Sequence, residues 1–345
     1  MAAYTGIQGQ NILIVSSDPA NPVEGQIWYN TTSNTLKDYQ TVVVAAAWAS
    51  GGNYPFAVSG SGAAGTQTAG LNFGGFNAPA DARTTATNEY DGSTWTAGGS
   101  MATARTTMGG CGTQTAAVGF GGYTEPPPTL FTDTESYNGT SWTATGALNT
   151  SRNSLMGAGI QTAGLAFGGA RPGGFPSPQG YTNTELFNGS TWTANPTGLP
   201  TARRGSGSAG TQTSALCFGG SQYPAPTTTI ATTDSFNGST WTAGGNLNTA
   251  RNSLSGAGVS STAAVAFGGS TPPTSPAYSA ATEVYNGTTW TNSTSMSNTR
   301  SGAAGLGTQP LALAIGGYTG TAYTAATEEF TGPSSGLQTR TITTS

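Results

Sequence analysis

Residues 263–290 read AAVAFGGSTPPTSPAYSAATEVYNGTTW, and this stretch decides the fold because its parts recur along the chain. Phe or Ile followed by Gly-Gly occurs six times, at intervals of 47–51 residues, with the Phe or Ile at positions 73, 120, 167, 218, 267 and 315. A tryptophan series runs in parallel at positions 48, 95, 142, 192, 241 and 290. Repetition at this period indicates a repeat architecture in which each copy forms one supersecondary unit.

Each copy reads as four short strands. Before Gly-Gly, large side chains such as Val265 and Phe267 alternate with small ones, which is the period of a strand packed between two sheets. A first strand precedes this run, and a third follows a variable loop at Thr282–Tyr285. Asn286-Gly287 then matches a two-residue type I′ turn, which needs positive φ at both central positions, and leads into a fourth strand at the tryptophan.

Composition supports the same interpretation. The chain has 345 residues, of which 53 are Gly and only 7% are charged. It is poor in helix formers and rich in turn residues, which favours all-β structure. Disorder is the alternative for such a composition, but aromatic residues make up 9% of the chain and recur at fixed spacing. The net charge of −4, with a single Lys, predicts no nucleic-acid partner, and no apolar run approaches the length of a membrane span.

A four-stranded copy of this length, with Gly-Gly after its second strand, an aromatic residue before a tight turn and a Trp in its fourth strand, resembles the kelch repeat. The resemblance covers about residues 40–333 and rests on six copies. It implies an all-β fold, a kelch-like β-propeller of about six four-stranded blades with seven as the alternative. A short N-terminal β extension precedes it.

Two charged positions recur inside the repeat. The first copy departs from both, with Val58 in the Arg slot and Asn88 in the acid slot. Because a lone buried charge carries a large penalty, this joint loss indicates that the two positions pair with each other in a structural role. The five expected pairs are Arg105 with Glu135, Arg152 with Glu185, Arg203 with Asp234, Arg251 with Glu283, and Arg300 with Glu328.

The sixth copy has three strands but no Trp after Phe330. Trp48 lies ten residues before Val58, and Trp95 lies ten residues before Arg105, so Trp48 has the same place relative to the next copy as the other tryptophans. Residues 41–49 are therefore predicted to form the fourth strand of the last blade and to close the ring, which removes open sheet edges. The tail Leu337–Thr344 is a rival for that place, or a fifth strand outside it.

The chain contains no His. This removes Ser-His-Asp catalysis, the usual zinc sites and the copper site of kelch propellers of the galactose oxidase type. A sialidase-like site would need an arginine cluster, and the repeat slot holds most of the arginines. Cys111 and Cys217 stand where sister copies carry small residues, so packing is their simplest role. We expect no enzymatic activity, no catalytic or metal-binding residues, and no cofactor.

A binding surface is expected on the loops that follow Gly-Gly, because these loops vary most in length and carry residues that the repeat does not explain. Tyr offers a wide contact area at low entropy cost, and exposed loops on a rigid scaffold often carry recognition. The alternative is that the loops shield the rim or pack on neighbouring subunits. Asp81 and Glu125 lie in these loops, and the candidate contact residues are Phe76, Arg83, Tyr123, Phe131, Arg171, Phe175, Tyr181, Tyr223, Tyr278, Tyr318 and Tyr323.

Residues 18–37 read DPANPVEGQIWYNTTSNTLK and resemble N-terminal segments of bacteriophage virion proteins, particularly tail-fibre and other appendage proteins of marine phages. The resemblance implies an attachment segment at 1–40 that docks a propeller at 41–345 onto other virion proteins. The expected protein is a multicopy structural component of the virion surface, as a tail appendage or capsid decoration, that contacts a host glycan or receptor. The alternative is a free or cell-surface carbohydrate-binding propeller.

Overall fold

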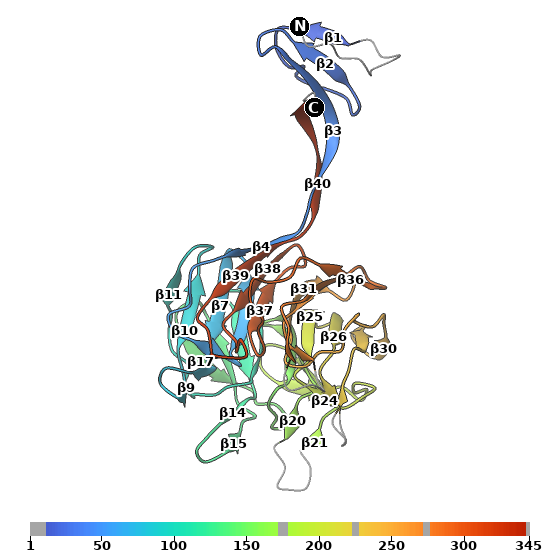
Figure 1. Cartoon of the computed structure of the whole chain (residues 1–345). Helices are drawn as coiled ribbons and strands as arrows, with labels where there is room; N and C mark the ends of the chain where they lie inside the picture. The colour runs from blue at the N-terminus through green and yellow to red at the C-terminus, as the bar shows by residue number, and fades with distance from the viewer. Residues whose placement is uncertain (1–11, 172–178, 223–227, 272–276, 343–345) are drawn as a thin grey trace. The chain divides into compact units, whose positions relative to one another are not determined.

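The computed structural model describes residues 12–171, 179–222, 228–271 and 277–342, and every element within them is a β-strand (Figure 1). The prediction of all-β structure is confirmed. No helix in these residues could span a membrane. The chain divides into two compact units, which we call the central unit, Ala47–Gly332, and the terminal unit, made of the residues up to Ala46 and those from Pro333 onward.

The central unit contains six four-stranded antiparallel sheets, here called the first to sixth repeat sheets. The first is β6 (Gly62–Thr66), β7 (Ala69–Phe73), β10 (Thr87–Tyr90) and β11 (Trp95–Ala97); the second is β12 (Gly109–Gly112), β13 (Ala117–Phe120), β16 (Thr134–Tyr137) and β17 (Trp142–Thr145). The third is β18 (Met156–Ile160), β19 (Ala163–Phe167), β22 (Thr184–Phe187) and β23 (Trp192–Ala194).

The remaining three repeat sheets have the same order of strands. The fourth is β25 (Gly207–Thr211), β26 (Ser214–Phe218), β29 (Thr233–Phe236) and β30 (Trp241–Ala243); the fifth is β31 (Ser255–Ser260), β32 (Ala263–Phe267), β35 (Thr282–Tyr285) and β36 (Trp290–Ser293). The sixth is β37 (Ala304–Gly307), β38 (Leu311–Ile315), β39 (Thr327–Thr331) and β4 (Ala47–Ser50).

The sixth repeat sheet takes its last strand from the start of the central unit. β4 pairs antiparallel with β39, so that Trp48 lies opposite Phe330. This strand falls at the end of the predicted closing segment 41–49 and one residue beyond it. The tail is not in this sheet, because Ser334–Thr341 forms β40 and pairs along its length with β3 (Thr35–Val44) in the terminal unit. The expected division at residue 40 therefore moves to residue 46, and the expected propeller segment loses its C-terminal residues.

The first strands of the repeat sheets follow one another in a cycle. β6 contacts β12, and the succession continues through β18, β25, β31 and β37, which in turn contacts β6. One left-handed residue before each sheet donates its backbone N–H to the carbonyl of its counterpart one sheet earlier, at 2.6–3.1 Å, and the first donates to the last. The members of this hydrogen-bonded cycle are Gly60, Thr107, Ser154, Gly205, Ser253 and Gly302.

The Gly-Gly marker ties each sheet to the next. The Gly75 N–H donates to the Arg105 carbonyl at 2.9 Å, and in the sixth sheet the Gly317 N–H donates to the Val58 carbonyl at 2.7 Å. Gly74 and Gly75 have φ of 62° and 99°. A Cβ on Gly74 would lie 2.9 Å from the Arg105 carbonyl oxygen. Both the backbone conformation and this close approach therefore require Gly.

The loops after Gly-Gly are not wholly irregular, because in the first five copies they fold into two-residue hairpin strands. In the first and fourth copies, a two-residue strand that begins at the Arg-slot position, Val58 or Arg203, pairs with the hairpin as a third strand. The strands are β5 (Val58–Ser59), β8 (Phe76–Asn77), β9 (Ala82–Arg83), β14 (Tyr123–Thr124), β15 (Thr129–Leu130), β20 (Ala170–Arg171), β21 (Gln179–Gly180), β24 (Arg203–Arg204), β27 (Ser221–Gln222), β28 (Thr228–Thr229), β33 (Ser270–Thr271) and β34 (Ala277–Tyr278).

The terminal unit is one four-stranded sheet in the order β1 (Leu13–Val15), β2 (Ile27–Asn30), β3 and β40, with β1 parallel to β2. Its buried apolar residues are Trp28 and Leu36. The Asp18 carboxylate accepts hydrogen bonds from the side chains of Lys37, Asn30 and Trp28 at 2.6, 2.7 and 3.0 Å. These bonds lower the pKa of Asp18 to about 2.

Candidate functional site

Six of the loop residues predicted to contact a ligand line one pocket of about 600 Å³ in the central unit. They come from the loops after the first, second, fifth and sixth Gly-Gly pairs. We call this the aromatic pocket; its lining includes Phe76, Arg83, Tyr123, Tyr278, Tyr318 and Tyr323, together with Asp81, Thr107 and Glu125. Local strand pairing positions some of these side chains, because Phe76 lies opposite Arg83 in the β8–β9 hairpin and Tyr123 and Tyr278 begin or end hairpin strands.

The aromatic rings form a continuous series along the pocket. Phe76 and Tyr323 have ring centroids 5.3 Å apart, Tyr323 and Tyr318 are 5.0 Å apart, and Tyr318 and Tyr278 are 5.3 Å apart. Tyr323 is 41% exposed, so part of its side chain is accessible to a ligand. Phe76 and Tyr318 each contact Tyr323 in a tilted geometry, and Tyr278 contacts Tyr318 edge-on.

Arg83 joins this series to the loop of the second copy. Its guanidinium carbon lies 5.5 Å from the centroid of Phe76 and 5.2 Å from that of Tyr123, within the range of cation–π attraction. Its Nη2 donates to the Tyr123 hydroxyl at 3.1 Å and forms an ion pair with Glu125. Burial lowers the pKa of Arg83, but its bonds to Tyr123 and Glu125 outweigh burial and raise that pKa overall. The cation is therefore already paired with a carboxylate of the pocket lining.

Two polar atoms in the lining lack a hydrogen-bond partner within the described part of the chain. One is the buried Nε of Arg83, and the other is the buried Oγ1 of Thr107. Thr107 belongs to the hydrogen-bonded cycle, as do Gly60 and Gly302, which also line the pocket. The pocket therefore has an aromatic side and a backbone side, with one unused N–H donor and one unused hydroxyl.

The other predicted contact residues lie elsewhere. Arg171 and Tyr181 line an adjacent hollow of about 540 Å³, which also includes Tyr123. The ring centroid of Phe131 lies 6.0 Å from the guanidinium carbon of the buried Arg105, so Phe131 has a structural role. Phe175 and Tyr223 lie outside the described residues.

The recurring Arg and acid side chains lie in contact, with each acid on the third strand of a repeat sheet and each Arg just before the first strand of that sheet. Arg105–Glu135, Arg152–Glu185, Arg251–Glu283 and Arg300–Glu328 have N···O distances of 2.8, 2.9, 2.8 and 2.5 Å, and Arg203 pairs with Asp234. Both members of every pair are buried. Each guanidinium also donates to backbone carbonyls, as Arg152 does to Gly168 and Asn183 at 3.1 and 2.8 Å. Arg152 thereby connects the two ends of the loop that follows Phe167.

The first copy replaces its missing ion pair with a neutral bond. The Asn88 amide donates to the hydroxyl of Tyr54 at 2.7 Å, and both residues are buried. Burial raises the pKa of Tyr54 above its usual range. Comparison among the copies holds a signal for Tyr54, because the position four residues before the Arg slot is Leu or Met in the other five copies and Tyr only in the first.

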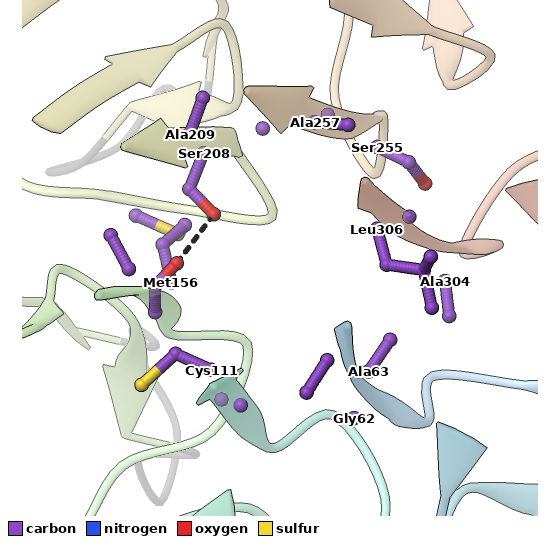
Figure 2. Close-up of a pocket in the computed structure, with 18 of the residues that line it drawn as sticks. Gly62, Ala63, Cys111, Met156, Ser208, Ala209, Ser255, Ala257, Ala304 and Leu306 are labelled. Carbon is purple, nitrogen blue, oxygen red and sulfur yellow. Dashed lines mark hydrogen bonds between the residues drawn. The ribbon is translucent and has the colours of Figure 1, made fainter. Parts of the chain in front are cut away.

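A second cavity, of about 220 Å³, is lined by residues of all six first strands (Figure 2). Its lining is mainly Gly, Ala and Ser, and the Ser208 hydroxyl donates to the Gly157 carbonyl at 2.9 Å. Cys111 lines it, and burial raises the pKa of that thiol to about 12. The described residues contain no group of three Cys, Asp or Glu side chains that could hold a metal ion. A ligand in this cavity would meet mainly backbone and small side chains, whereas a ligand in the aromatic pocket would meet aromatic, charged and hydroxyl side chains.

No protein family matches this chain, and a comparison with curated proteins finds no relative.

Proposed function

We propose that this chain is a non-enzymatic structural protein of a bacteriophage particle. In this proposal a kelch-like, six-bladed β-propeller is displayed on the virion surface, as a tail appendage or capsid decoration, and attaches to the host cell. The observation that carries the adhesive role is the gathering of five aromatic side chains and one Arg from four separate loops into the aromatic pocket. Convergent aromatic and polar groups in a pocket of this size are typical of ligand sites.

A six-bladed propeller is supported by the connections between sheets. The succession of first strands returns from β37 to β6, and the backbone cycle has one member before each of the six repeat sheets. The fourth strand of the sixth sheet comes from the N-terminal side, which fastens the last blade to the first part of the unit. This arrangement favours six blades over seven.

Attachment to the particle is assigned to the terminal unit. The phage-like stretch at 18–37 provides β2, the start of β3 and the Asp18 network. Strand pairing adds β40 to the same sheet. Two short connections, residues 45–46 and 332–333, join this unit to the central unit. The chain on both sides of the central unit therefore belongs to the terminal unit. Contacts with other virion proteins are therefore expected through this unit.

The pocket chemistry supports binding rather than catalysis. Its charged residues are Asp81, Arg83 and Glu125, of which the last two neutralise each other. The sequence supplies no His as a general base at neutral pH. A set of aromatic rings around a neutralised cation provides contact area and orientation.

Mass spectrometry and immunogold labelling of purified particles test the proposal. We expect a constant stoichiometric copy number and labelling at one location on the particle. Purified protein should also compete with particles for adsorption to host cells. If the chain is absent from gradient-purified particles but binds cells, the alternative of a free or cell-surface carbohydrate-binding propeller replaces the virion assignment.

A further inference from the structure

We infer that the aromatic pocket binds an uncharged pyranose residue of a surface glycan, with the sugar stacked on Tyr323 and hydrogen-bonded to Arg83 and Thr107. The inference rests on the proposed adhesive function and specifies its ligand class. The pocket volume of about 600 Å³ accommodates one or two sugar rings.

The aromatic series provides the stacking surface. A pyranose presents one face of C–H groups, which packs on an aromatic ring and removes apolar area from water. Tyr323 is suited to this role because it is 41% exposed and is held between Phe76 and Tyr318. A rigid ring loses little conformational entropy when the ligand binds.

The unpartnered polar atoms provide the orientation. Both atoms are buried, so a ligand must displace part of the lining before the Nε–H of Arg83 can donate to a sugar oxygen or the hydroxyl of Thr107 can donate or accept. Buried polar groups normally have partners, and leaving one unpaired costs stability. A ligand hydroxyl within reach of either atom would satisfy it, which an apolar ligand could not do.

The charges favour a neutral ligand. Arg83 is already paired with Glu125, and Asp81 adds a second carboxylate to the lining. A sugar carboxylate would therefore face a net negative wall rather than a free cation. The same arrangement disfavours a quaternary ammonium ligand, because the cation position over Phe76 and Tyr123 is occupied by Arg83 itself.

Binding of the full-length protein to an array of neutral and acidic oligosaccharides, followed by titration calorimetry with the best neutral ligand, tests the inference. Tyr323→Ala should weaken binding at least about tenfold, whereas Tyr323→Phe should retain it because the stacking face remains. Tyr29→Ala is the matched control, since Tyr29 belongs to the terminal unit and does not line the aromatic pocket, so affinity should be unchanged. Melting temperatures of all variants establish that each one is folded.

Arg83→Lys distinguishes orientation from bulk charge. It keeps the positive charge but removes the Nε–H of the guanidinium, so it should weaken binding about tenfold and reduce discrimination among epimeric sugars. Binding confined to acidic glycans, equal affinity of wild type and Tyr323→Ala, or no glycan binding at all would each overturn the inference. The particle analysis is independent of these results: a virion-bound protein that ignores neutral sugars refutes the ligand class and leaves the virion assignment intact.

Discussion

Trp48 donates its indole N–H to the hydroxyl of Thr282 at 3.0 Å, although 234 positions separate the two residues. The same bond recurs between every other repeat tryptophan and a threonine of the preceding sheet, at 2.8–3.1 Å: Trp95 with Thr327, Trp142 with Thr87, Trp192 with Thr134, Trp241 with Thr184, and Trp290 with Thr233. Trp48 also packs on Phe267 and Phe330, with centroids 5.2 and 5.1 Å apart. A strand near the N-terminus thus completes the contact between the fifth and sixth sheets.

Deleting residues 1–50 should lower the melting temperature of the central unit far more than deleting residues 1–46. The longer deletion removes β4 and exposes the edge of β39, whereas the shorter one spares that strand. Trp48→Ala alone should cost about 2 kcal/mol, because the half-buried indole loses its packing against two Phe rings. Calorimetry on the three variants measures the effect. Equal melting of the two deletions would refute closure by β4.

Arg152→Met should destabilise the protein by about 3–5 kcal/mol, since it leaves Glu185 buried without a counter-charge. Arg152→Met combined with Glu185→Gln should recover a large part of that loss. The Gln can still accept the hydrogen bond that the Asn149 N–H donates to Glu185 at 2.8 Å. Urea unfolding of the two single variants and the double variant measures the coupling free energy between Arg152 and Glu185. A double variant as unstable as the sum of its two single changes would show that the residues act independently.

Asn138→Asp should leave stability at pH 7 nearly unchanged, whereas Asn138→Ala should cost about 1 kcal/mol. The Asn138 side chain accepts from the backbone N–H groups of Thr140 and Ser141 at 3.0 and 2.9 Å. Asp91 makes the equivalent bonds in the first sheet, and those from Thr94 and Ser93 hold its pKa below the usual range. Thermal unfolding compares the variants; a marked loss in Asn138→Asp would contradict the equivalence of the turns.

Acid should loosen the terminal unit between about pH 4 and pH 2. The pKa of Asp18 is lowered from 3.8 to about 2 by its hydrogen bonds, so its contribution to stability is complete above its unfolded pKa and is lost as pH falls through its folded pKa. The indole N–H resonance of Trp28, which donates to this carboxylate, should titrate with a midpoint near 2. Asp18→Asn should abolish that titration, and a midpoint near 3.8 would show that the network does not form.

The sequence by itself determined the repeat, the four strands of each copy and the expected Arg–acid pairing. These features are local or recur in register, so alternation, turn chemistry and comparison among copies reveal them. The Gly-Gly marker belongs to the same class, because it imposes a particular backbone conformation on its own residues. The two-residue type I′ turn expected at Asn286-Gly287 is wrong: Tyr285 pairs with Trp290, which leaves four residues in the turn, and Gly287 but not Asn286 has a positive φ.

Only the tertiary structure decided which end completes the sixth sheet, what replaces the ion pair in the first, and which loop residues meet. Residues 41–49 and the tail both have strand character, and only pairing with β39 separates them. Tyr54 stands where the other copies carry Leu or Met, and only the structure shows that its hydroxyl accepts a hydrogen bond from Asn88. The aromatic pocket joins loops more than 200 residues apart, such as those of Phe76 and Tyr323. Local patterns carry no information on such a contact, because it depends on how successive sheets are placed around one another.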